Sequence, residues 1–139
     1  MRILFDSSAL FKRYAGETGA TQVAALHDQA TTVVLAAHCH VELVSALTRQ
    51  WREGAFSEDE YRRVRDAMRN DFEAYQVGAL DRTVEDFAMA AMLLSPLRAM
   101  DAVHIATAQA ARAALFVTAD RRQAAAAQAV GLKTELVQA

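Results

Sequence analysis

The chain has 139 residues, enough for one compact domain spanning residues 1–139 and hardly for two. Fifteen basic residues against 17 acidic ones give a net charge of −2, so bulk charge does not indicate a nucleic-acid partner. A single cysteine excludes an internal disulfide framework, and the chain shows neither a signal-like start nor an apolar run of membrane length. We therefore expect a soluble, cytoplasmic protein.

Apolar patterning in the first half of the chain predicts two strands and four helices. Residues 3–5 form an apolar run typical of a buried strand, and Ser7 is placed to cap the helix that follows. Ser57 and Glu60 form a capping-box pattern at the start of a long helix. The predicted strands cover residues 3–5 and 32–36, and the predicted helices cover residues 9–15, a segment around Val23 and Leu26, residues 38–53 and residues 57–74.

The second half continues the alternation of strands and helices. Its predicted strands cover residues 75–80, 115–117 and 134–137, and its predicted helices cover residues 82–95, 101–112 and 121–130. Because strands alternate with helices throughout, we expect an α/β fold, with a mostly parallel five-stranded sheet between helices on both faces.

Four acids occupy positions where a charge is unusual. Asp6 and Asp120 each follow a short apolar strand, so their carboxyl groups would lie side by side if those strands are neighbours. Glu42 falls at the border of the buried face of its helix, and Asp101 begins a helix on the same face as Ile105. Taken singly, Asp101 and Asp120 also suit ordinary helix caps, and Glu42 suits a border charge.

Together the four acids predict a metal site. Several carboxylates gathered at one place repel one another, so a cation has to hold them. Ligation by carboxylate oxygens alone suits Mg²⁺ or Mn²⁺ and not zinc. Such ions polarise phosphoryl oxygens and activate water, which indicates cleavage of a phosphodiester.

Four blocks of the sequence resemble the PIN-domain ribonucleases, and among them the VapC toxins of bacterial toxin–antitoxin pairs. The blocks are residues 6–10 (DSSAL) with Lys12 and Tyr14, residues 42–47 (ELVSAL), residues 101–108 (DAVHIATA) and residues 117–121 (VTADR). The resemblance extends from Met1 to about Leu132. It implies a three-layer α/β/α PIN-like domain.

The same resemblance implies the activity and its residues. Asp6, Glu42, Asp101 and Asp120 would bind Mg²⁺ or Mn²⁺ and cut single-stranded RNA, with Ser7 and Thr118 supporting the site. Lys12, Arg13 and Arg121 are our candidates for contact with RNA phosphates, although each also suits a solvated surface charge. The implied partners are a small VapB-type antitoxin and a second copy of the chain, giving a homodimer and, with antitoxin, a heterotetramer or a larger assembly. Gln123 replaces a frequently apolar residue, which we expect to affect helix packing and not the site.

Several alternatives remain at this point. A PIN-like fold retained for protein binding, with weak catalysis, is the main one, although such modules usually lose one or more of the acids. The segment His38-Cys39-His40 invites a zinc interpretation, but residues two apart on a helix point in nearly opposite directions. We expect Cys39 to be a small buried hydrophobe and His104 to be a packed core histidine rather than a base.

Overall fold

The computed structural model describes residues 1–138, and Ala139, the last residue of the predicted domain, lies outside them. It contains five strands and seven helices in that range. The strands are β1 (Arg2–Phe5), β2 (Thr32–Leu35), β3 (Gln76–Val77), β4 (Leu115–Thr118) and β5 (Thr134–Leu136). The helices are α1 (Ser7–Ala15), α2 (Ala20–Gln29), α3 (Cys39–Arg52), α4 (Glu58–Phe72), α5 (Arg82–Leu94), α6 (Ala99–Ala110) and α7 (Arg121–Ala129).

All five strands are parallel, in the order β3-β2-β1-β4-β5. Strand β1 therefore lies at the centre, paired with β2 on one side and with β4 on the other. The chain runs outward from β1 to β2 and β3 and then crosses to β4 on the other side of β1. In open α/β sheets, ligand sites form where the strand order reverses in this way. The predicted five-stranded α/β sheet is confirmed.

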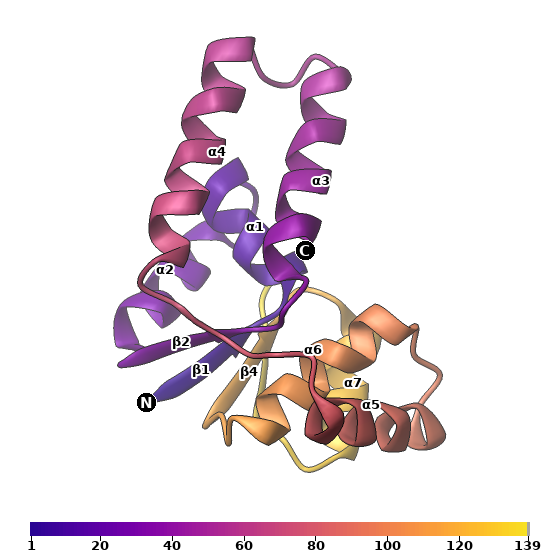
Figure 1. Cartoon of the computed structure of the whole chain (residues 1–139). Helices are drawn as coiled ribbons and strands as arrows, with labels where there is room; N and C mark the ends of the chain where they lie inside the picture. The colour runs from indigo at the N-terminus through magenta and orange to yellow at the C-terminus, as the bar shows by residue number, and fades with distance from the viewer. Residues whose placement is uncertain (139) are drawn as a thin grey trace.

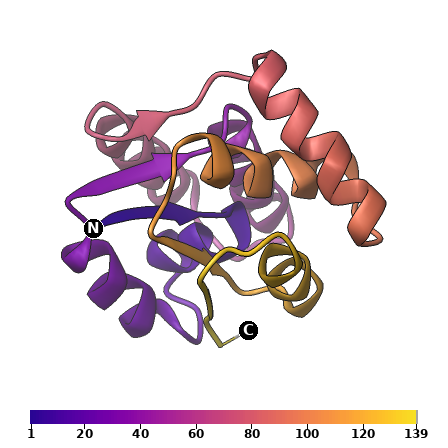
Figure 2. The same ribbon diagram turned by 90° about the horizontal axis from the view of Figure 1, so that it is seen from below.

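Alternation along each strand produces two separate cores. Ile3 and Phe5 point into the layer formed by α1, α2, α3 and α4, whereas Leu4 between them points toward α5, α6 and α7. Val33 and Val34 divide in the same way on β2. The sheet thus lies between two helical layers, with α5 alongside α6 on the outer side (Figures 1 and 2). This is the three-layer α/β/α arrangement that the sequence predicts.

Helices α3 and α4 extend beyond the sheet as an antiparallel pair (Figure 1). Trp51 stacks on Tyr61 with ring centroids 4.8 Å apart, and the hydroxyls of Tyr61 and Thr48 are 2.7 Å apart. The predicted capping box is present at the start of α4, with reciprocal bonds between Ser57 and Glu60. These contacts hold the pair together at a distance from the sheet edge.

Three predicted boundaries were wrong. Helix α1 begins at Ser7 and is capped by Asp6, whose Oδ1 accepts the N–H of Ala9, because aspartate is as good a cap as serine and stands one residue earlier. Helix α6 begins at Ala99, so Asp101 lies in its first turn and does not open it. The strand predicted over residues 75–80 is reduced to Gln76–Val77 at the sheet edge.

Candidate functional site

Asp6 and Asp120 lie at the same edge of the sheet. The Asp6 N–H donates to the carbonyl oxygen of Val117 at 3.0 Å, which extends the β1–β4 pairing to the point where α1 begins. Asp120 follows β4 by two residues and caps α7, with its Oδ1 accepting the N–H groups of Arg122 and Gln123. The neighbouring strands assumed from the sequence are therefore present, and both acids stand where they end.

Asp6 is the most buried of the four acids, at 3% exposure. Its Oδ1 accepts from Ser8 Oγ at 2.7 Å and from the N–H of Ala9 at 3.0 Å, and its Oδ2 accepts from Thr118 Oγ1 at 2.5 Å. Burial raises the pKa of Asp6, although the charge of His104 and the hydrogen bonds from Thr118, Ser8 and Ala9 oppose that rise. The protein thus holds a carboxylate in a place that disfavours its charge.

Glu42 lies in the first turn of α3 and is half-buried. Its Oε1 accepts from Ser7 Oγ at 2.7 Å, lies 2.7 Å from His104 Nε2 and lies 3.3 Å from His38 Nε2. Burial alone would raise the pKa of Glu42, but the hydrogen bonds from His104 and Ser7 and the charges of the two histidines outweigh burial and lower it to about 2. Glu42 is therefore ionised at neutral pH.

The charges of the other three acids affect the pKa of Asp101. Burial raises the pKa of its carboxyl, His104 partly opposes this, and the charges of Asp120, Asp6 and Glu42 raise the pKa further. The four predicted acids therefore share one electrostatic environment at the sheet edge. A divalent cation with carboxylate ligands would relieve this repulsion, so the donor set fits Mg²⁺ or Mn²⁺.

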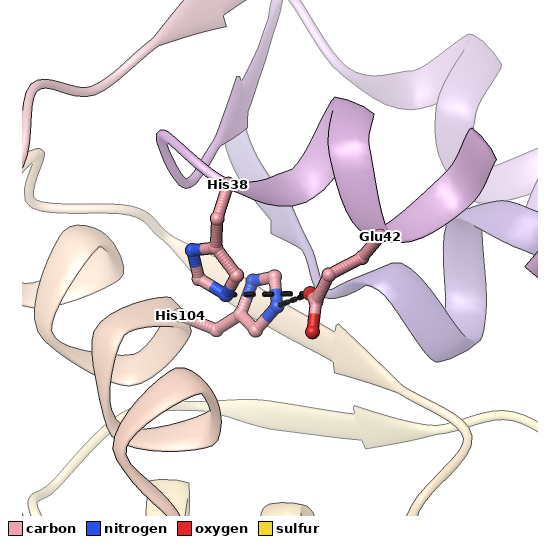
Figure 3. Close-up of side chains that lie close together, drawn as sticks. All are labelled: His38, Glu42 and His104. Carbon is pink, nitrogen blue, oxygen red and sulfur yellow. Dashed lines mark hydrogen bonds and ion pairs between the residues drawn. The ribbon is translucent and has the colours of Figure 1, made fainter. Parts of the chain in front are cut away.

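The side-chain oxygens of the four acids nevertheless do not form one close cluster. Across residues 1–138, no three of these acids place ligand oxygens within 4.8 Å of one another. The group that meets this distance consists of His38, Glu42 and His104 (Figure 3). A metal bound by all four acids would require side-chain rotation.

The two histidines around Glu42 are functional candidates that the sequence argument missed. His104 is 2% exposed, as expected of a core histidine, yet its Nε2 faces Glu42 and lies 3.4 Å from Ser7 Oγ. Burial and the neighbouring His104 lower the pKa of His38. The spacing of four between His38 and Glu42 within one helical turn was the available signal.

Cys39 and His40, the other two residues of the His38-Cys39-His40 segment, lie outside this cluster. His40 stacks on Phe72 with centroids 4.3 Å apart, so the two histidines of this segment have different neighbours, as their spacing predicts. Cys39 is fully buried, which confirms its role as a small core residue, and burial raises its pKa to about 12.

A groove of about 660 Å³ opens beside Glu42. Ser7, Ser8 and Lys12 from α1 line one side of it, and Glu42 and Arg49 from α3 line the other. Lys12 is 4% exposed, so it is packed within the groove wall and is not the solvated side chain that its sequence position also allowed. With Glu17 also in its lining, the groove therefore combines two acids with two cations.

Arg13 and Arg121, the other two predicted phosphate contacts, lie in different environments. Arg13 Nε lies 3.8 Å from Asp71 Oδ2, a carboxylate that also accepts the Tyr14 hydroxyl. Arg121 is exposed in the first turn of α7, directly after Asp120. Arg121 is thus open to a ligand at the sheet edge, whereas Arg13 already faces an acid.

Gln123 touches the site more directly than the sequence suggested. It is 2% exposed, and its Nε2 donates to the carbonyl oxygen of Asp101 at 3.0 Å. Its N–H also donates to Asp120 Oδ1. One buried polar side chain therefore links the first turns of α6 and α7, which carry two of the four acids.

Comparison with known proteins identifies the fold. The family model described as the PIN domain matches residues 3–129. Curated protein sequences give no match. None of the helices in the described part of the chain has the length and apolar character that a membrane crossing needs.

Several solved structures share the architecture. FitAcB from Neisseria gonorrhoeae superimposes with a TM-score of 0.71 at 15% identity, covering 95% of each chain. VapC20 from Mycobacterium tuberculosis, described as a sarcin-ricin loop cleaving toxin, gives 0.68 at 16% identity, covering 89% of this chain and 94% of its own. A toxin–antitoxin complex from Klebsiella pneumoniae gives 0.65 at 19% identity, covering 87% and 88%. With the family model spanning nearly its whole length, this chain belongs to the PIN-domain family.

Proposed function

We propose that this PIN-domain protein is an endoribonuclease that depends on Mg²⁺ or Mn²⁺ and cleaves single-stranded regions of RNA. The observation that carries the proposal is that the neighbouring strands β1 and β4 bring Asp6 and Asp120 to the same edge of the sheet. Burial and the charges of Asp120, Asp6 and Glu42 also raise the pKa of Asp101. Four acids that repel one another at the open edge of a parallel sheet are arranged for a divalent cation and its anionic substrate. The similar VapC20 structure is described as that of a sarcin-ricin loop cleaving toxin, which supports a nuclease function for this chain.

The catalytic residues are Asp6, Glu42, Asp101 and Asp120, which would hold the ion through carboxylate oxygens. When bound, Mg²⁺ or Mn²⁺ supplies a Lewis acid that polarises the phosphoryl oxygen and acidifies water. Thr118 and Ser7 position Asp6 and Glu42 through the hydrogen bonds that each hydroxyl donates. Because water attacks and not the ribose 2′-hydroxyl, the products carry a 5′-phosphate and a 3′-hydroxyl.

The basic residues near the site orient the RNA backbone in this proposal. Lys12 lines the groove beside Glu42, and Arg121 follows Asp120 at the sheet edge. Both side chains can neutralise phosphates without reading bases. Arg13, which faces Asp71, contributes least.

The biological role that we propose is the toxin of a type II toxin–antitoxin pair acting in the cytoplasm. Several structural neighbours are toxin–antitoxin complexes, including VapBC2 from Rickettsia felis bound to a promoter DNA fragment. The partners would be a VapB-type antitoxin and a second copy of this chain, forming a homodimer that joins antitoxin in a heterotetramer or a larger assembly. The whole chain, residues 1–139, would act as one domain.

Cleavage of a single-stranded RNA with and without metal tests the proposal. Purified protein should cut the RNA with added Mn²⁺ or Mg²⁺ and stop when a chelator is added, and Asp101→Asn should be inactive under both conditions. Matched Asp86→Asn, an exposed acid on α5, should cut like wild type. Undiminished cleavage in chelator would overturn the metal mechanism. Folded wild-type protein that never cuts RNA would favour a binding module instead.

A further inference from the structure

Two imidazole nitrogens face one carboxylate oxygen beside the four-acid site. His38 and Glu42 come from the start of α3, and His104 comes from α6, so the cluster joins the two helical layers (Figure 3). Nε2 of His38 lies 3.3 Å from Glu42 Oε1, and Nε2 of His104 lies 2.7 Å from the same oxygen. An ion pair with Glu42 would need only one of these imidazole rings. It does not explain why the second ring lies against the same oxygen.

His38 presents a polar atom without a hydrogen-bond partner to the cluster. Its Nε2 is buried and makes no hydrogen bond among the described residues, although it lies 3.3 Å from Glu42 Oε1. In a neutral imidazole with its proton on Nδ1, this Nε2 carries a lone pair. A cation between that lone pair and the ionised Glu42 carboxylate would satisfy both groups.

The distances also suit a small, borderline-soft ion. Two ligands bound tetrahedrally to Zn²⁺ at its usual bond lengths lie about 3.4 Å apart, which matches the 3.3 Å between His38 and Glu42. The shorter His104 contact has to lengthen by about 0.7 Å, which the half-exposed Glu42 side chain allows by rotation. Ser7 Oγ, within 3.4 Å of His104 Nε2 and 2.7 Å of Glu42 Oε1, borders the open fourth position.

We propose that His38, Glu42 and His104 bind a transition-metal ion of the Zn²⁺ class. Two imidazoles and one carboxylate select such ions over Mg²⁺, which prefers oxygen ligands alone. This site shares Glu42 with the four-acid site but is otherwise separate from it. It requires neither RNA cleavage nor a toxin role.

Calorimetric titration with Zn²⁺ tests this site without reference to activity. The measurement starts from Asp101→Asn, which disables the four-acid site and leaves all three proposed ligands. This variant should bind one Zn²⁺ per chain. Adding His38→Ala should weaken binding by at least about tenfold, since loss of a ligand costs no less than loss of a supporting residue. Adding His40→Ala, which removes the nearby histidine stacked on Phe72, should leave binding unchanged.

Two results would overturn the proposal. One is equal Zn²⁺ affinity with and without His38, in protein whose circular dichroism and melting temperature show that it is folded. The other is loss of Zn²⁺ binding in Asp101→Asn itself, which would assign the ion to the four acids. In a separate assay, the wild-type protein is tested for Mn²⁺-dependent RNA cleavage. Absence of cleavage there would count against the proposed nuclease function and leave the Zn²⁺ result standing.

Discussion

The Thr118 hydroxyl donates a 2.5 Å hydrogen bond to Asp6 Oδ2, joining the ends of β4 and β1 across 112 residues of sequence. The same Thr118 oxygen accepts the N–H of Asp120 at 3.0 Å. One fully buried hydroxyl thus connects two of the four acids to the strands that carry them. Its position explains why a threonine, and not an isosteric valine, ends the strand.

Thr118→Val should therefore destabilise the protein. The substitution keeps the shape but removes the Thr118 hydroxyl from Asp6 Oδ2 and from the Asp120 N–H, at a cost of about 1–3 kcal/mol in the free energy of unfolding. Urea unfolding measures this loss. Thr107→Val is the matched control, because the buried Thr107 hydroxyl bonds only back to Val103 O in its own helix and should cost clearly less. Equal losses in the two variants would contradict the special position of Thr118.

Ionisation of Glu42 should make the stability of the folded protein depend on pH. Its pKa of about 2 in the folded protein lies below the ordinary value of 4.5, so ionised Glu42 stabilises the fold at pH above 4.5. That contribution is lost as the pH falls from 4.5 toward 2. In metal-free protein, the stability difference between wild type and Glu42→Gln should shrink over this interval, as measured by urea unfolding at several pH values. A difference that stays constant across the interval would show that Glu42 is not held by His104 and Ser7.

Much of the fold could be predicted because buried parallel strands are continuous apolar runs. Residues 3–5 and 115–117 follow this rule, and each is closed by a polar group at the sheet edge. Because Asp6 and Asp120 each follow such a strand, the sequence alone predicted that they lie together at the sheet edge. The short β3 was overextended in the prediction because an edge strand lacks the second neighbour that would prolong its pairing.

The environment of the acids was less accessible from sequence. His104 and Glu42 are 62 residues apart, and their contact depends on how α6 packs against the start of α3. No local pattern encodes that packing angle. Likewise, burial of Lys12 depends on the groove wall around it, and the role of Gln123 depends on where Asp101 turns its carbonyl. Long-range contacts of this kind decide the partners of each acid.

The capping box of α4 supports the projecting helix pair and not the sheet edge. Ser57→Ala removes the acceptor for the Glu60 N–H and should cost about 1 kcal/mol of stability, as helix caps usually do. RNA cleavage should be unchanged, because the cap lies away from the four acids. Thermal unfolding and the cleavage assay measure the two effects, with the exposed Ser45 changed to Ala as a control. A large loss of RNA cleavage would mean that the end of the α3–α4 helix pair, far from the sheet, takes part in the reaction.

Lys12 and Arg121 should each carry one phosphate contact. In the inactive Asp101→Asn background, changing either residue to Gln should weaken binding of single-stranded RNA. Each change should also reduce the slope of log affinity against log salt by about 0.7, the value for one phosphate on a single strand. Arg63→Gln on the exposed face of α4 should leave the slope unchanged. Filter binding at several salt concentrations measures this slope. Identical slopes in all variants would show that Lys12 and Arg121 do not contact RNA phosphates.

Thermal unfolding of wild type and Asp6→Asn, with and without Mn²⁺, tests the metal site most directly. Burial works against the Asp6 charge, and that charge in turn raises the pKa of Asp101, so without metal Asp6→Asn should melt at the wild-type temperature or higher. Wild type should gain about 2.7 kcal/mol at a hundredfold excess of Mn²⁺ over its dissociation constant, and the variant should lose most of that gain together with RNA cleavage. A variant that melts clearly lower without metal, yet keeps the full Mn²⁺-induced rise, would show that Asp6 supports the fold and that the ion binds elsewhere.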